Sequence, residues 1–270
     1  MKGIDIVLIP TLGRMDKQTT YEALPPHLQD LTHFVVQSHE FEPMKERYPN
    51  VICLPKTIKT IEDTREWLQS EYNDVNYVMI DDDVKFLKVD HPHNNAEGKW
   101  KKTHMTAQDF MDWELWLISE WKAGHVLCGM CNTVAPPSVQ YWPTKYNGRV
   151  LHLFAWNGRA KNKPDMTGCW LFKWAEDMHF TLEILTRGYK IPLSAEFVIG
   201  PGAGQAKGGC STTRTIKGYN HQMREFEKRW PDYVKVVPKI NKGGVWKGLL
   251  QNKVRVQWAK AWKHGQMNKS

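Results

Sequence analysis

Four short apolar runs in the first 90 residues constrain the fold of this chain most. Each run is bounded by turn residues, and together they cover residues 4–9, 33–37, 51–54 and 77–80. A helix is predicted after the third run, because Thr60 and Asp63 suit a capping box and apolar residues recur from Ile61 to Tyr72 at helical spacing. Strands that alternate with helices predict a doubly wound α/β sheet, which binds ligands beyond the carboxyl ends of its strands.

The remaining residues continue this pattern less regularly. Helices and strands are predicted in alternation for residues 106–124, 125–130, 150–156 and 176–188. Residues 91–104 are polar and are expected to form an exposed loop, and the Gly-rich residues 200–215 a mobile one. We therefore expect a domain over residues 1–232, with a nucleotide-binding half of about 1–90 and an acceptor half of about 91–232.

The net charge of +8 is concentrated in the last 38 residues. Residues 233–270 carry eight lysines and one arginine without an acidic side chain, whereas the rest of the chain has 28 basic and 29 acidic side chains. Such a segment suits a polyanion, either nucleic acid or an anionic membrane surface, although a basic tail can also serve solubility alone.

The basic segment is predicted to be an amphipathic helix. Apolar residues recur every fourth position, with lysines between them, at Trp246, Leu250, Val254, Trp258 and Trp262. Such a helix can present lysines to DNA phosphates, lie on an anionic membrane, or only pack on the domain. These three uses are given in order of preference, so we expect DNA to be the partner.

The cysteine content and the N-terminus predict a cytoplasmic protein. The chain has five cysteines, and its first apolar run is interrupted by Asp5 and Pro10 before it reaches the length of a signal peptide or a membrane span. No later apolar run is long enough to cross a membrane. Cys128 and Cys131 form a CxxC within an apolar run, which indicates buried structural thiols.

Three consecutive carboxylates follow the fourth apolar run directly. Side chains alternate along a strand, so Asp81 and Asp83 are expected on one side and Asp82 on the other. Like charges at this spacing need a cation or a basic partner, and Mg²⁺ or Mn²⁺ can share carboxylates with the phosphates of a bound nucleotide. A solvated acidic turn is the alternative. Arg14 and Arg65 are of the residue type that pairs well with phosphate.

These motifs resemble a known family in their order and spacing. Residues 9–14 (Ile-Pro-Thr-Leu-Gly-Arg), Thr64-Arg65 and residues 80–84 (Ile-Asp-Asp-Asp-Val) resemble the donor half of GT-A glycosyltransferases, and the triplet is similar to their DxD motif. The pattern over about residues 1–230 looks closest to the phage DNA glycosyltransferases of the TET-associated group. The resemblance implies a GT-A-like fold and, for a phage-encoded chain, the host cytoplasm.

The resemblance also implies roles for individual residues. It places Pro10, Thr11, Arg14, Arg65 and Asp82 beside the nucleotide, Asp81 at the ribose or the metal, and Asp83 on the metal. By the same resemblance Asp177 is expected to be the base that deprotonates the acceptor, with Glu176 second. The pair also opens a predicted helix, where acidic residues are favoured by the macrodipole alone.

Two further features are assigned to the donor site. Within the Gly-rich loop, Lys207 and Arg214 are expected to reach the diphosphate, unless the loop is a plain connection. His221, a lone histidine after this loop, is a candidate metal ligand.

The sequence therefore predicts a metal-dependent glycosyltransferase that uses a nucleotide-diphosphate sugar and acts on hydroxymethyl-pyrimidine in DNA. A base within a duplex would be flipped out for reaction, and tryptophans could stack on it. The alternatives are a glycosyltransferase for polysaccharide or lipid-linked acceptors, a non-catalytic nucleic-acid-binding protein and, less favoured, a nucleotidyltransferase. Liposome binding would indicate the first alternative, and DNA binding without sugar transfer the second. Consumption of a nucleoside triphosphate would indicate the third.

Overall fold

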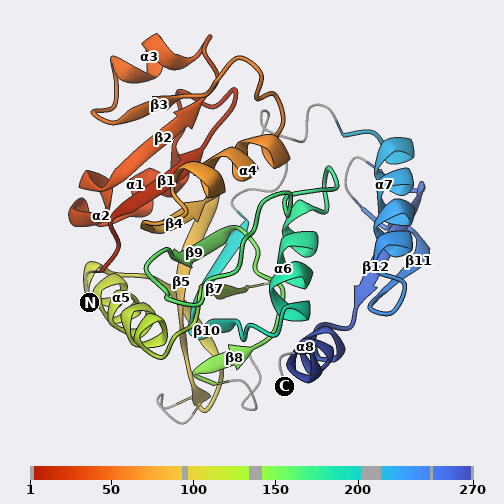
Figure 1. The fold of residues 1–270 in the computed structure, drawn as a ribbon. Coiled ribbons are helices and arrows are strands. Elements are labelled where there is room, and N and C mark those ends of the chain that lie inside the picture. The colour runs from red at the N-terminus through yellow and green to blue at the C-terminus, as the bar shows by residue number, and fades with distance from the viewer. Residues whose placement is uncertain (1–2, 93–96, 134–141, 202–213, 244–245, 269–270) are drawn as a thin grey trace.

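The computed structural model describes residues 3–92, 97–133, 142–201, 214–243 and 246–268. Within them the chain forms a mixed ten-stranded sheet with helices on both faces, and a separate two-stranded hairpin near the C-terminus (Figure 1). The sheet order is β3-β2-β1-β4-β9-β7-β10-β5-β6, and β8 pairs with β10 at one side. The prediction of an α/β protein is thereby confirmed.

The N-terminal part of the sheet is parallel. Its strands are β1 (Ile6–Pro10), β2 (Thr32–Val36), β3 (Val51–Cys53) and β4 (Asn76–Ile80), which match the four apolar runs within two residues. Between them lie the helices α1 (Thr19–Ala23), α2 (Pro26–Asp30), α3 (Phe41–Lys45) and α4 (Ile61–Glu71). The Thr60 side chain caps α4 by accepting from the backbone N–H of Asp63, as the sequence predicts.

The remainder of the sheet mixes strand directions. It contains β5 (Val84–Asp90), β6 (Lys101–His104), β7 (Leu127–Asn132), β8 (Thr144–Tyr146), β9 (Leu153–Asn157) and β10 (Pro192–Pro201). Strand β9 runs antiparallel to both β4 and β7, so the parallel pattern ends at β4. The expected loop over residues 91–104 is wrong at its end, because β6 pairs with β5 as a polar edge strand.

Alternating residues of the strands feed two hydrophobic cores. Leu8 of β1 faces one core together with Leu68 of α4, whereas Val7 and Ile9 face the other. The first core also contains α6 (Glu176–Thr186) and α7 (Ile216–Arg229), and the second contains α5 (Ala107–Lys122). A sheet with both faces covered leaves the strand ends as the place where polar side chains gather.

The predicted C-terminal helix from Trp246 to Trp262 is wrong over most of its length. Strands β11 (Val234–Ile240) and β12 (Leu250–Val256) form an antiparallel hairpin, and only α8 (Trp258–Met267) is helical. The four-residue spacing of the apolar residues coincides with a two-residue alternation, in which Val254 and Val256 face the core while Lys253 and Arg255 are exposed. No helix among the described residues is long and apolar enough to cross a membrane.

Candidate active site

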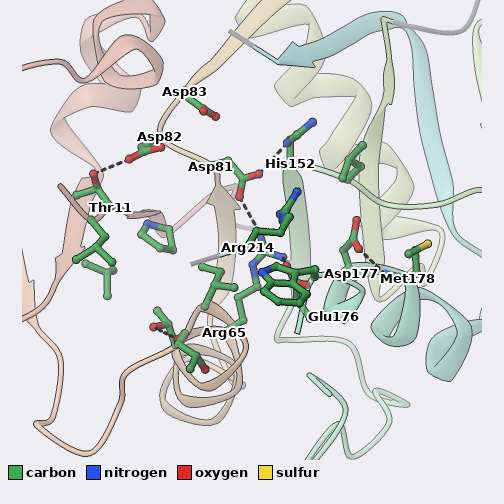
Figure 2. Close-up of a pocket in the computed structure, with 18 of the residues that line it drawn as sticks. Thr11, Arg65, Asp81, Asp82, Asp83, His152, Glu176, Asp177, Met178 and Arg214 are labelled. Carbon is green, nitrogen blue, oxygen red and sulfur yellow. Dashed lines mark hydrogen bonds and ion pairs between the residues drawn. The ribbon is translucent and has the colours of Figure 1, made fainter. Parts of the chain in front are cut away.

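A cavity of about 730 Å³ opens at the carboxyl ends of β1 and β4. Its walls come from the loop after β1, the first turns of α4 and α6, the segment before β9, and the C-terminal hairpin with the start of α8. The cavity is lined by a set of polar and charged side chains that includes Thr11, Arg14, Arg65, Asp81, Asp82, Asp83, Arg149, His152, Glu176, Asp177, Arg214, Tyr219 and Lys253. Thr11 and Arg14 therefore lie beside the acidic triplet at this end of the sheet, as Figure 2 shows for Thr11 and Asp82.

Asp81 is held between a buried arginine and a histidine. Its Oδ1 accepts from Arg65 Nη2 at 2.7 Å and its Oδ2 lies 2.7 Å from His152 Nδ1. Burial alone would raise the pKa of Asp81, but the charges and hydrogen bonds of Arg65 and His152 outweigh it and hold the pKa at about 2. This carboxylate is ionised throughout the neutral range.

Asp82 and Asp83 share a different arginine. Asp82 accepts from Thr11 Oγ1 at 2.6 Å and forms an ion pair with Arg14, while Asp83 Oδ2 lies 3.0 Å from Arg14 Nη1. The expected pairing of Asp81 with Asp83 on one side is therefore wrong. The three residues occupy the tight connection between β4 and β5 rather than a strand, so side-chain alternation does not apply to them.

Burial changes the protonation of Asp82. Removal from water raises its pKa to about 6, although the Thr11 hydroxyl and Arg14 favour the charged form. The Thr11 hydroxyl is itself positioned, because it accepts from Gln18 Nε2 at 3.2 Å. The loop after β1 thus binds one carboxylate of the triplet from two sides.

Arg65 connects the triplet to the acidic pair at the start of α6. Its Nη1 donates to Glu176 Oε1 at 2.9 Å, and its guanidinium lies 5.1 Å from the ring centroid of Phe154 and 5.4 Å from that of Trp170. Burial raises the pKa of Glu176, and the neighbouring charge of Asp177 adds to this effect. The structure therefore brings the buried Arg65 and Glu176 together with the half-buried Asp81 in one ionic group.

Asp177 faces the cavity on the other side of Glu176. Its Oδ2 accepts from Arg149 Nε at 2.7 Å, and its Oδ1 accepts from the backbone N–H of Met178 at 2.7 Å (Figure 2). The side chain is 5% exposed and stands in the first turn of α6, where backbone N–H groups favour a negative charge. A hydroxyl that reached this end of the cavity would meet an oriented carboxylate.

The remaining sequence-predicted residues are placed unevenly. Pro10 and the exposed Arg214 line the cavity. His221 is exposed on α7, beside Glu225, and is not among the residues that line the cavity, so the structure does not bring it to Asp81 and Asp83. Lys207 lies outside the described residues.

The carboxylates fit a metal ion only when other ligands complete its shell. No group of three or more His, Cys, Asp or Glu side chains suited to a metal occurs within the described part of the chain. Both oxygens of Asp81 and Asp82 already have protein partners, whereas the Asp83 side chain is 34% exposed with one oxygen on Arg14. This arrangement suits an ion bound by one or two carboxylates and shared with phosphate oxygens, rather than a cage made by protein alone.

Sequence reasoning missed several residues that line the cavity. His152 binds Asp81 twice, since its carbonyl also accepts from the Asp81 N–H at 2.9 Å, and its φ of 66° is unusual for a residue with a side chain. Arg149, Tyr219 and Lys253 come from segments far apart in the chain. No local motif marks these four residues, because the tertiary fold alone brings them to the triplet.

Part of this chain matches a known protein family. A family model described as TET-Associated Glycosyltransferase matches residues 6–115, which contain the loop after β1, Arg65 and the whole triplet. The chain is related to the TET-associated glycosyltransferases. Two curated relatives, the beta-glucosyl-HMC-alpha-glucosyl-transferases of Enterobacteria phages T6 and T2, are each 20% identical over 233 residues, covering 83% of this chain and 81% of each relative. The resemblance to the phage DNA glycosyltransferases of the TET-associated group is confirmed, and the protein is a glycosyltransferase.

Proposed function

We propose that this glycosyltransferase transfers a sugar from a nucleotide-diphosphate donor to a hydroxyl group on a hydroxymethylated pyrimidine in DNA, with help from a divalent metal ion. The observation that carries the proposal is the meeting, in one cavity, of the acidic triplet with its arginines and of the Glu176–Asp177 pair. The relatives' names supply the acceptor class, since HMC denotes hydroxymethylcytosine.

The donor occupies the end of the cavity beside β1 and β4 in this proposal. Pro10 and Thr11 contact the nucleotide, while Arg14 and Arg65 stabilise the diphosphate as negative charge grows on it during bond cleavage. Arg214, which also lines the cavity, adds a third cation. A Mn²⁺ or Mg²⁺ ion would be held by Asp83, the most exposed carboxylate of the triplet, and would supply further charge compensation for the leaving diphosphate.

The acceptor hydroxyl reacts near the start of α6. Asp177 accepts the hydroxyl proton, the hydroxyl oxygen forms a bond to the anomeric carbon, and the bond from that carbon to the diphosphate oxygen breaks. Arg149 fixes the orientation of Asp177 through the contact at its Oδ2. Glu176 is buried against Arg65, and we assign it to positioning that arginine, with proton transfer as its second role.

The relatives' names also indicate a more specific acceptor. A beta-glucosyl-HMC-alpha-glucosyl-transferase adds glucose to a base that already carries glucose. By that analogy, the attacking hydroxyl belongs either to the hydroxymethyl group or to a sugar attached to it. Both acceptors present a neutral hydroxyl on a base flipped out of the duplex.

A donor and acceptor panel tests the proposal directly. The protein is incubated with Mn²⁺ and individual nucleotide sugars, together with duplexes that carry cytosine, hydroxymethylcytosine or glucosylated hydroxymethylcytosine. We expect release of nucleotide diphosphate and a sugar-sized mass increase only with a modified duplex. We also expect Asp83→Asn and Asp177→Asn each to lower transfer at least about 100-fold. Transfer to lipid-linked or polysaccharide acceptors alone, or DNA binding without turnover, would refute it.

A further inference from the structure

The C-terminal hairpin carries an exposed row of basic side chains beside the cavity. Lys235 and Arg255 lie directly opposite each other in the β11–β12 register, and Lys239 and the exposed Lys253 follow on the same face. Figure 1 shows the hairpin alongside α7 on the side of the molecule away from β1–β3. Lys253 also lines the cavity together with Arg149 and Arg214. The basic row therefore continues into the site.

Within the described part of the chain, no acidic side chain forms a salt bridge with this row. Among the residues that the structure describes, Lys235, Lys253 and Arg255 form no ion pair. Glu227 lies close enough for its pKa to be affected by Lys235, but its oxygens are bound by the Val236 N–H and by Arg224. Like charges directly opposite each other across two strands destabilise a hairpin. An external polyanion would remove that cost.

The hairpin also ends in exposed apolar side chains. Ile240 and Leu250 form the pair at the end of its register and are 63% and 52% exposed, and Leu249 beside them is 45% exposed. The opposite end of the hairpin is anchored, because Val234 and Val236 are buried against α7. A two-stranded ribbon with basic flanks and an apolar end has the dimensions to enter a groove of duplex DNA, where apolar side chains contact base edges.

We propose that the β11–β12 hairpin is the surface that binds the acceptor duplex. This inference rests on the proposed function, in which DNA carries the acceptor. Lys235, Arg255 and Lys239 bind phosphates, the end of the hairpin lies in a groove, and Lys253 guides the reacting nucleotide toward Asp177. The occupant is duplex DNA rather than a membrane, since the basic row leads directly into the cavity that holds the reacting groups.

The first experiment measures binding of the full-length chain to an unmodified duplex at several salt concentrations. We expect Lys235→Ala/Arg255→Ala to bind more weakly and to reduce the slope of log affinity against log salt by about 2, because two phosphate contacts are lost. The matched control is Lys45→Ala/Lys56→Ala, which removes two exposed cations near α3 and should bind as the unmodified chain does. Circular dichroism confirms that each variant is folded.

The outcomes separate this inference from the proposed function. An unchanged salt slope in Lys235→Ala/Arg255→Ala would overturn the hairpin as the DNA surface. Binding to phosphatidylserine vesicles is measured in parallel. The inference is also overturned if the variant loses vesicle binding but keeps DNA binding. The inference survives and the proposed function fails if the hairpin variant loses DNA binding but the unmodified chain transfers sugar to no modified duplex.

A second variant tests the groove. Ile240→Thr/Leu250→Thr changes no charge, so we expect it to lower duplex affinity several-fold without altering the salt slope. Affinity equal to that of the unmodified chain would overturn the placement of the hairpin end in a groove.

Discussion

Arg65 is the residue through which the two acidic groups of the cavity act on each other. It binds Asp81 with one nitrogen and Glu176 with another, and the rings of Phe154 and Trp170 lie beside its guanidinium. A planar fork can make both contacts at once, whereas the single ammonium of lysine cannot reproduce that geometry. Any change in the charge of Glu176 therefore alters the balance of charge around Asp81.

Glu176 makes the stability of the fold depend on pH. Burial raises its pKa above the ordinary value of 4.5, so folding favours the protonated form. The stability that protonated Glu176 contributes is complete at a pH below the ordinary pKa. It is lost as the pH rises through the raised pKa of the folded state. We expect Glu176→Gln, which stays neutral, to gain on the order of 1 kcal/mol of unfolding free energy relative to the unmodified chain between about pH 5 and about pH 8.

Urea unfolding at both pH values measures this difference. Asp165, whose carboxylate is exposed, supplies the control Asp165→Asn. A constant difference between Glu176→Gln and the unmodified chain across the two pH values would show that Glu176 does not titrate in this range.

At the scale of elements, the C-terminal helix is held by a close backbone contact. Ala261 and Gly265 of α8 are one turn apart and buried, and a Cβ on Gly265 would lie 2.3 Å from the carbonyl oxygen of Leu185 at the end of α6. That distance is far below van der Waals contact with a backbone atom, which cannot rotate away. Only glycine allows α8 to lie this close to α6.

The Gly265→Ala variant is therefore expected to push α8 away from α6. We expect a loss of about 1–3 kcal/mol in unfolding free energy and reduced sugar transfer, since Trp258 at the start of α8 lines the cavity. Gly243→Ala is the matched control, because a Cβ there meets nothing within 4 Å. Thermal unfolding and transfer assays on both variants test the contact. Equal melting temperatures for the two would contradict it.

Elements with a strong local signal were predictable from the sequence. The strands of the parallel half and the capped helices α4 and α5 follow from apolar spacing and from Thr60 and Thr106. The hairpin was not predictable in this way, because its valines fit both a helical and a strand period. Packing of Val234 and Val236 on α7 favours the strand. Strand β6 was missed because an edge strand needs little apolar character.

The candidate site divides in the same way. Thr11, Arg14 and the triplet stand at strand ends, which sequence can locate. His152 and Arg149 reach the cavity only through the antiparallel return of β9, and a sequence pattern carries no register between distant strands.

At the scale of the whole molecule, the C-terminal segment after residue 232 contributes to the site. Lys253, Val254, Val256 and Trp258 line the cavity, and Val234 and Val236 belong to the same core as α6 and α7. The boundary predicted at residue 232 therefore falls between segments that share a core.

A chain that ends at residue 232 tests this arrangement. We expect it to melt at a lower temperature, to bind a hydrophobic dye because Met223 and Phe226 lose their cover, and to lose turnover of the nucleotide sugar. Calorimetry, dye fluorescence and nucleotide release measure the three effects. An unchanged melting temperature and donor turnover, with only DNA binding lost, would instead describe an independent appendage.

The positive φ at His152 affects which variants would be favoured by selection for heat resistance. A φ of 66° costs about 1–2 kcal/mol for a residue with a Cβ and nothing for glycine, so His152→Gly should relieve the conformation while removing a contact to Asp81. We expect that variant to lose sugar transfer while it keeps or improves its melting temperature, which scanning calorimetry and a transfer assay would record. Laboratory evolution of this chain for heat resistance alone would accordingly drift toward glycine at position 152 and yield durable but inactive clones.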